Sequence, residues 1–119
     1  MAAQIVTLTE SGAGVRKVKW AWTSATGGGV TQATSRYYDG KVIALVTDPG
    51  ATAPTADYDV AINDSDSVDV LVGAGIDRHT SATELVASAS LGAVANSKLT
   101  LVITNAGDEK TGTVYLYIR

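Results

Sequence analysis

The stretch 41-KVIALVTDPGATAPTADYDVAINDSDSVDVLVGAG-75 decides the fold class of this chain. It contains three short β-rich runs, at 41–47, 57–63 and 68–72, which are separated by turns built from Asp, Pro, Gly and Asn. The first run is apolar on both faces and predicts a central strand, whereas the second alternates apolar and acidic residues and predicts a half-buried one. Such punctuation is typical of an all-β domain in which the chain reverses locally.

The clearest alternation in the chain lies upstream, in the run VRKVKWAWT that begins at residue 15. Val18, Trp20 and Trp22 fall on one face of this predicted strand, and Lys17 and Lys19 fall on the other. A period of two with this division indicates a strand that is buried on its tryptophan face.

Four further β-rich runs lie at residues 3–9, 30–38, 97–104 and 113–118. Asp39-Gly40 predicts a tight hairpin turn, whereas residues 82–89 fit a short capped helix or a strand equally well. Because there is no sustained helical periodicity, no repeat and no linker, we expect one domain over residues 1–119. About eight short strands predict an antiparallel β-sandwich of jelly-roll-like or immunoglobulin-like type.

The composition of the 119 residues argues against several classes of protein. Charged residues are only 18%; a small domain with few charges is often covered in part by a partner, although a Thr-rich monomer has a similar composition. The net charge of −3 argues against a nucleic-acid binder. The sequence contains no run of about 18 apolar residues, so no membrane-spanning helix is predicted. The N-terminal residues lack a secretory-signal pattern. Without cysteine there is no disulfide, thiolate nucleophile or cysteine-bound zinc.

The acidic residues between positions 57 and 69 are the most site-like feature of the sequence: Asp57, Asp59, Asp64, Asp66 and Asp69. Calcium prefers several oxygen ligands at one point, but the turn lacks the glycine and the closing glutamate of an EF-hand loop. We therefore predict no metal site. Instead we expect these carboxylates in turns and on strand edges, where charge also discourages edge-to-edge aggregation.

Two other patterns have weak functional interpretations. GAGIDR at 73–78 imitates the start of a dinucleotide-binding fingerprint, but Arg78 occupies the third glycine position and no βαβ unit surrounds it. His79, the only histidine, has Asp77 and two hydroxyl side chains nearby in sequence as partners for general-base chemistry. No nucleophile-elbow motif is present. The sequence therefore predicts no catalytic residue, no cofactor and no enzymatic activity.

Six basic and aromatic residues form the predicted interface with a partner or with other copies of the chain: Arg16, Lys17, Lys19, Tyr37, Tyr38 and Arg78. The first three are expected to form one basic face, opposite the tryptophans, whose charge would orient an acidic partner. Because Tyr37 and Tyr38 are adjacent, one of them should point outward, where an aromatic ring suits an interface.

A characteristic order of strand and turn motifs runs through most of the chain. In sequence order the motifs are KWAWT (19–23), DPG (48–50), YDV (58–60), the acidic turn 64–69, VLVGAG (70–75) with DR (77–78), LTL (99–101) and TNAG (104–107). In these motifs the chain resembles small structural proteins of tailed-bacteriophage virions, of the capsid decoration or cement type. Ser67 departs from the pattern, because a turn glycine is expected at that position.

The resemblance implies a protein that is made in the host cytoplasm and resides on the capsid surface. There it would bind the major capsid protein and stabilise the shell by bridging neighbouring subunits. It also implies a homo-oligomer, dimer or trimer, that needs no cofactor and binds neither nucleic acid nor membrane. Two alternatives stay open: a tail, connector or fibre-associated virion component, and a β-sandwich module that binds carbohydrate or a host surface.

Overall fold

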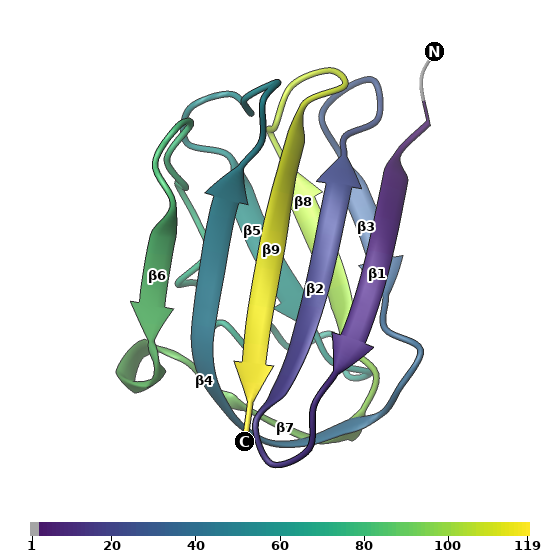
Figure 1. The fold of residues 1–119 in the computed structure, drawn as a ribbon, viewed down its shortest axis with the longest axis vertical. Helices are drawn as coiled ribbons and strands as arrows, with labels where there is room; N and C mark the ends of the chain where they lie inside the picture. Colours follow the sequence, from purple (N-terminus) through teal and green to yellow (C-terminus); the bar gives the residue numbers. More distant parts are fainter. Residues whose placement is uncertain (1–2) are drawn as a thin grey trace.

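Two packed antiparallel β-sheets form the fold in the computed structural model, which describes residues 3–119 (Figure 1). The larger sheet contains, in spatial order, β1 (Ile5–Ser11), β2 (Arg16–Thr23), β9 (Thr111–Ile118), β4 (Tyr38–Pro49) and β6 (Glu84–Ala87), and β7 (Ala93–Ser97) pairs with β4. The smaller sheet has the order β3 (Val30–Ala33), β8 (Thr100–Thr104) and β5 (Asp59–Asn63). The predicted all-β antiparallel sandwich is confirmed, with nine strands in the described residues.

The core lies between the two sheets and follows from the alternation along the strands. Val18, Trp20 and Trp22 of β2 are buried, as predicted. Trp22 meets Tyr58 from the segment before β5, with ring centroids 5.9 Å apart and ring planes tilted by 54°. A tilted aromatic pair of this kind adds to the stabilisation from burial alone, so this contact ties the larger sheet to the smaller one.

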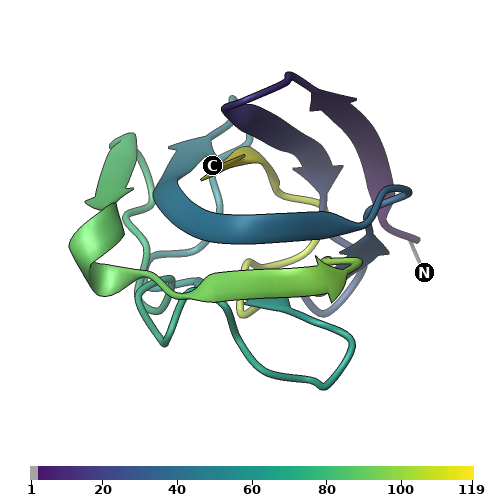
Figure 2. The same ribbon diagram turned by 90° about the horizontal axis from the view of Figure 1, so that it is seen from below.

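β4 is a twelve-residue strand that pairs with β7 near its start and, further along, with β9 on one side and β6 on the other (Figure 2). Its first residues pair with β7, and from Val42 onward it pairs with β9. The predicted hairpin at Asp39-Gly40 is wrong, because both residues lie inside β4 at a shift in the register with β7. Gly40 has a φ of 129°, and a Cβ there would lie 2.4 Å from the carbonyl oxygen of Arg119, so a close approach and not a turn requires the glycine.

The predicted strand at 68–72 is also wrong, because this segment makes a single β-bridge, from Asp69 to Asn63, and then forms turns. The Asp69 carboxylate accepts the backbone N–H groups of Ile62, Leu71 and Gly73, each at 3.0 Å. A side chain that bonds nearby backbone donors offers the chain an alternative to a sheet ladder, despite the β-rich composition. Residues 82–89, for which helix and strand were equally expected, form β6 and then a 3-10 turn at Ser88–Ser90.

Glu10 joins β1 to the loop that leads into β4. Its carboxylate accepts hydrogen bonds from the Tyr38 hydroxyl (2.6 Å) and from the backbone N–H groups of Ser35 (2.9 Å) and Arg36 (3.1 Å). Burial alone would raise the pKa of Glu10, but these hydrogen bonds outweigh it and hold that pKa below its usual range. Burial, together with the contact to Glu10, raises the pKa of Tyr38.

Replacing Glu10 by glutamine is expected to lower the free energy of unfolding by about 1–2 kcal/mol near pH 7, because the hydrogen bonds lose their charged, partly exposed acceptor. A carboxylate whose pKa is lowered by folding stabilises fully above its unfolded pKa of about 4.3. That contribution is lost as the pH falls through the lower, folded-state pKa. Urea unfolding at about pH 7 and about pH 3 checks both statements.

Glu109→Gln is the control for this experiment, because Glu109 is exposed. We expect it to change stability by less than about 0.5 kcal/mol at either pH. A deficit of the Glu10→Gln variant that is as large at low pH as at neutral pH would contradict the assigned role of the carboxylate.

Candidate docking surface

The outer face of the larger sheet is turned toward the viewer in Figure 1, and no further layer from residues 3–119 packs on it. Side chains paired across antiparallel strands share a face, and the buried residues of β2 and β9 define the inner one. We call the outward side chains the docking face: Ile5, Thr7, Thr9 and Ser11 of β1, Lys17, Lys19, Ala21 and Thr23 of β2, Thr111, Thr113, Tyr115 and Tyr117 of β9, Ala44, Val46 and Asp48 of β4, and Leu85 and Ala87 of β6.

Two lysines and a tyrosine occupy the middle of the docking face. The Nζ atoms of Lys17 and Lys19 lie 5.4 and 5.7 Å from the centroid of the Tyr115 ring, within the range of a cation–π interaction. The only carboxylate of the docking face is Asp48, which accepts a hydrogen bond from the Thr83 hydroxyl at 2.9 Å. The face is therefore locally basic, although the chain carries a net charge of −3.

Aliphatic side chains flank this basic centre on both sides. Leu85 is 68% exposed and pairs with Val46 of the neighbouring strand, and Ile5 on the opposite margin is 66% exposed. Near Ile5, small side chains such as Ala21 and Thr113 line a shallow depression of about 330 Å3. Exposed aliphatic and aromatic side chains gathered on one face are typical of surfaces that bind other proteins.

Of the six residues predicted for an interface, Lys17 and Lys19 lie on the docking face. Arg16 lies on the inner side of β2, because the period of two groups it with Val18 and not with the lysines. Its guanidinium donates a hydrogen bond to the backbone carbonyl of Asp39. The expected basic face of three residues is therefore reduced to two.

The adjacent tyrosines point in different directions, as expected. Tyr37 is 64% exposed, and its ring centroid lies 5.6 Å from the Nζ atom of Lys98; neither residue belongs to a strand of the docking face. Tyr38 is buried, and its hydroxyl is bound to Glu10. Only Tyr37 of this pair therefore offers a ring to a partner.

Tyr115 and Tyr117 of the docking face were not among the residues predicted for an interface. Their signal is nevertheless present in the sequence, because they alternate with residues of β9 that are buried. Aromatic rings on the face of a strand that is expected to meet solvent indicate a surface for binding.

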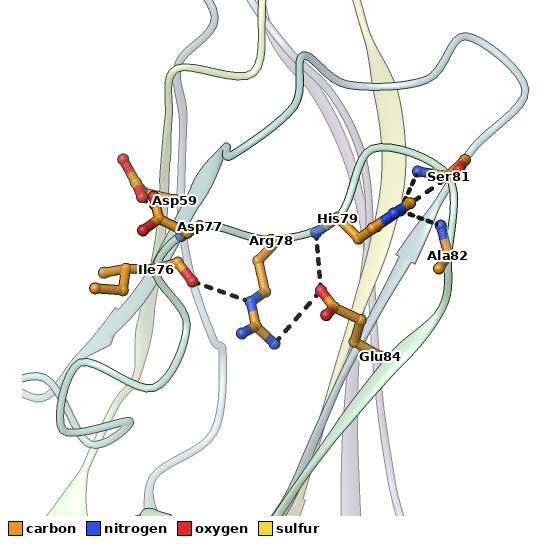
Figure 3. A network of polar contacts seen from close by, with 8 residues as sticks. All are labelled: Asp59, Ile76, Asp77, Arg78, His79, Ser81, Ala82 and Glu84. Carbon is orange, nitrogen blue, oxygen red and sulfur yellow. Dashed lines mark hydrogen bonds and ion pairs between the residues drawn. The ribbon is translucent and has the colours of Figure 1, made fainter.

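Arg78 and His79 belong to a hydrogen-bonded loop that Figure 3 shows from close by. The Arg78 guanidinium lies 3.8 Å from Glu84 Oε1, and the same oxygen accepts the backbone N–H of His79 at 2.8 Å. The His79 ring points away from this pair, and its Nδ1 accepts the backbone N–H groups of Ser81 (3.0 Å) and Ala82 (2.8 Å). The side chains of Arg78 and His79 thus hold the loop before β6 in shape.

Three of the five acidic residues between positions 57 and 69 hold turns through their carboxylates. Asp59 accepts the backbone N–H of Asp77 at 3.0 Å, Asp64 accepts two backbone N–H groups of its own turn, and Asp69 accepts three. Their oxygen atoms bind separate backbone donors and do not converge on one point. Among residues 3–119, no three His, Asp or Glu side chains form a group that could hold a metal ion.

Ser67 has the left-handed backbone conformation that its turn requires, with a φ of 62°. Ser67→Gly is therefore expected to raise the free energy of unfolding by about 0.5–1 kcal/mol, because relief of the Cβ strain exceeds the added entropy of the unfolded chain. Thermal unfolding checks this, with Ser65→Gly as the control, since Ser65 has no positive φ and gains nothing from the change. A Ser67→Gly variant that is less stable than the wild type would contradict the claim that the Cβ of Ser67 strains the backbone of this turn.

Comparisons with protein-family models, curated proteins and solved structures gave no significant match. No helix in the described part of the chain is long and apolar enough to cross a membrane. The chemistry of the docking face is therefore the main structural guide to function.

Proposed function

We propose that this chain is a structural protein of a tailed-bacteriophage virion that binds the capsid shell and bridges neighbouring major capsid protein subunits. The observation that carries the proposal is the docking face, which presents two lysines over an aromatic ring between aliphatic margins. The motif resemblance supports the same role. On this proposal the protein is made in the host cytoplasm, resides on the capsid and acts by binding alone.

The chemistry of the docking face specifies what it would bind. Lys17 and Lys19 favour a partner surface with carboxylates at the centre of the contact, and their charge would set its orientation. Leu85 and Ile5 favour apolar side chains at the two margins, where burial supplies most of the affinity. A protein that binds the assembled shell better than free subunits stabilises the shell by mass action.

Removing the gene from the phage tests the proposal at the level of the particle. We expect virions without the protein to lose their genome at a lower temperature than wild-type virions, and added purified protein to restore the difference. Particles of unchanged composition and unchanged heat resistance would contradict a role in the shell. Density on the tail in a virion map would favour a tail, connector or fibre-associated component instead.

A second candidate function is a carbohydrate-binding module, which the depression on the docking face favours. Four threonines, Thr7, Thr23, Thr111 and Thr113, are among the residues that line it, and hydroxyl groups can exchange hydrogen bonds with a sugar. A glycan array probed with the purified chain separates the two functions. Glycan binding that Thr113→Val abolishes would support the module, and an array without binding would remove it.

A further inference from the structure

The outer edges of the two sheets are formed by β1, β6 and β7 in the larger sheet and by β3 and β5 in the smaller one, and all but β1 are closed or short, β7 having five residues. The backbone of Val60 at the β5 edge bonds to Gly75 of the loop that covers it. At the β3 edge, the side-chain amide of Gln4 bonds both the carbonyl (2.6 Å) and the N–H (2.7 Å) of Thr31. β6 has four residues and begins at Glu84, a charge of the kind that discourages pairing at an edge.

β1 is the remaining edge, and it is both long and open. All seven of its residues pair with β2, and no main-chain hydrogen bond joins its other side to any part of residues 3–119. The strand reads IVTLTES, without Lys, Pro or bulge, and its one charge, Glu10, is bonded to the loop before β4. Val6 and Leu8 point toward the core yet are only partly buried. An unprotected edge of this kind is a template for another strand.

We propose that β1 pairs antiparallel with β1 of a second copy of this chain, so that two larger sheets join into one continuous sheet across a two-fold axis. Full overlap of the seven residues places the axis at Leu8. Thr7 of each copy then lies opposite Thr9 of the other, and the two Leu8 side chains meet on the inner side. Thr–Thr pairs are favourable across strands, and no like charges face each other.

A second copy suits this edge better than a foreign strand, because a two-fold axis brings the same open edge to both sides of the contact. Leu8 of one copy covers Leu8 of the other, and Val6, which lies opposite Glu10, is diagonal to that Leu8. The pairing therefore removes from water part of the apolar surface that the edge position leaves exposed. The pairing uses the main-chain edge of β1 together with Thr7 and Thr9 at the β1 margin of the docking face, and it involves neither Lys17 nor Tyr115 at the centre of that face. It therefore stands whether or not the chain binds a capsid.

Two variants with opposite charge patterns test the pairing. Thr7→Glu with Thr9→Glu places like charges opposite each other across the axis, whereas Thr7→Lys with Thr9→Glu places opposite charges there. In both variants the carboxylate at position 9 lies beside Lys19 of the same copy, so the effect on the single chain is matched at that position. We expect the first variant to associate about tenfold more weakly than the second.

Sedimentation equilibrium over concentrations of about 1 µM to 1 mM measures the association. The wild-type mass is expected to rise from 12.2 kDa toward twice that value. Hydrogen exchange of the wild type, which needs no variant, should show the outward amides of β1 becoming protected as the concentration rises. A wild type that stays monomeric throughout, or two variants that associate equally, would overturn the proposal.

Discussion

Replacing Asp69 by alanine is expected to lower the free energy of unfolding by about 3–4 kcal/mol. The carboxylate accepts the backbone N–H groups of Ile62, Leu71 and Gly73. Hydrogen bonds to a charged group contribute about 1.5–3 kcal/mol each, and donors left without a partner add a penalty. Because the site is partly exposed, water compensates for part of the loss. Urea unfolding, which is close to two-state for domains of this size, measures the change.

Two variants keep this prediction specific to the hydrogen bonds. Asp69→Asn retains the carbonyl oxygen that can serve Ile62 and Leu71, so we expect a loss of about 1–2 kcal/mol. Asp66→Ala removes an exposed carboxylate of the same acidic segment and should cost less than about 0.5 kcal/mol. Equal losses for Asp69→Ala and Asp66→Ala would mean that the turn does not depend on the Asp69 carboxylate.

Gly112→Ala is expected to lower the free energy of unfolding by about 2–3 kcal/mol, through a collision with Trp22. A Cβ at Gly112 would lie 2.6 Å from Cζ2 and 2.9 Å from Cε2 of the indole ring. The ring has little room to move, because Trp22 is 2% exposed and packs on Tyr58 between the sheets. Gly29→Ala is the control, since its added Cβ would meet nothing closer than 3.9 Å.

A double-mutant cycle identifies Trp22 as the cause of that loss. In a Trp22→Phe background the ring atoms nearest to Gly112 are absent, so Gly112→Ala should cost at least about 1 kcal/mol less than in the wild type. The same cost in both backgrounds would show that the substitution acts through the backbone of β9 and not through the indole.

Local alternation was enough to predict much of this fold. The period of two in β2 identified the strand and its buried face, since side chains on a strand alternate whatever the partner, and the run at 113–118 identified β9. The hairpin turn predicted at Asp39-Gly40 was wrong, because these residues pair with β7 instead. β7 lies more than fifty residues away in the chain, and a local turn signal does not contain that pairing. The strand predicted at 68–72 was wrong for a different reason. The Asp69 carboxylate accepts hydrogen bonds from the nearby backbone N–H groups of Leu71 and Gly73, which favours turns over a strand.

The docking face was predicted only in part, because it depends on strand order. Lys17 and Lys19 could be assigned to the outer face from their own strand. Their partner Tyr115 comes from β9, and nothing local in the sequence places β9 between β2 and β4. Leu85 could not be assigned while the conformation of residues 82–89 was open. Surfaces assembled from distant strands require the non-local pairing that single-sequence patterns do not contain.

On the proposed function, the gene for this chain lies in a phage genome that also encodes a major capsid protein. Binding of the purified chain to empty shells of that protein tests the central claim most directly. Lys19→Glu and Lys98→Glu change the net charge equally, and each removes a lysine that lies over a tyrosine ring, at 5.7 and 5.6 Å. In cosedimentation we expect saturable wild-type binding, a loss of at least about tenfold for Lys19→Glu, and wild-type binding for Lys98→Glu. Failure of the wild type to bind shells would contradict the proposed function, and full binding by Lys19→Glu would contradict the docking face.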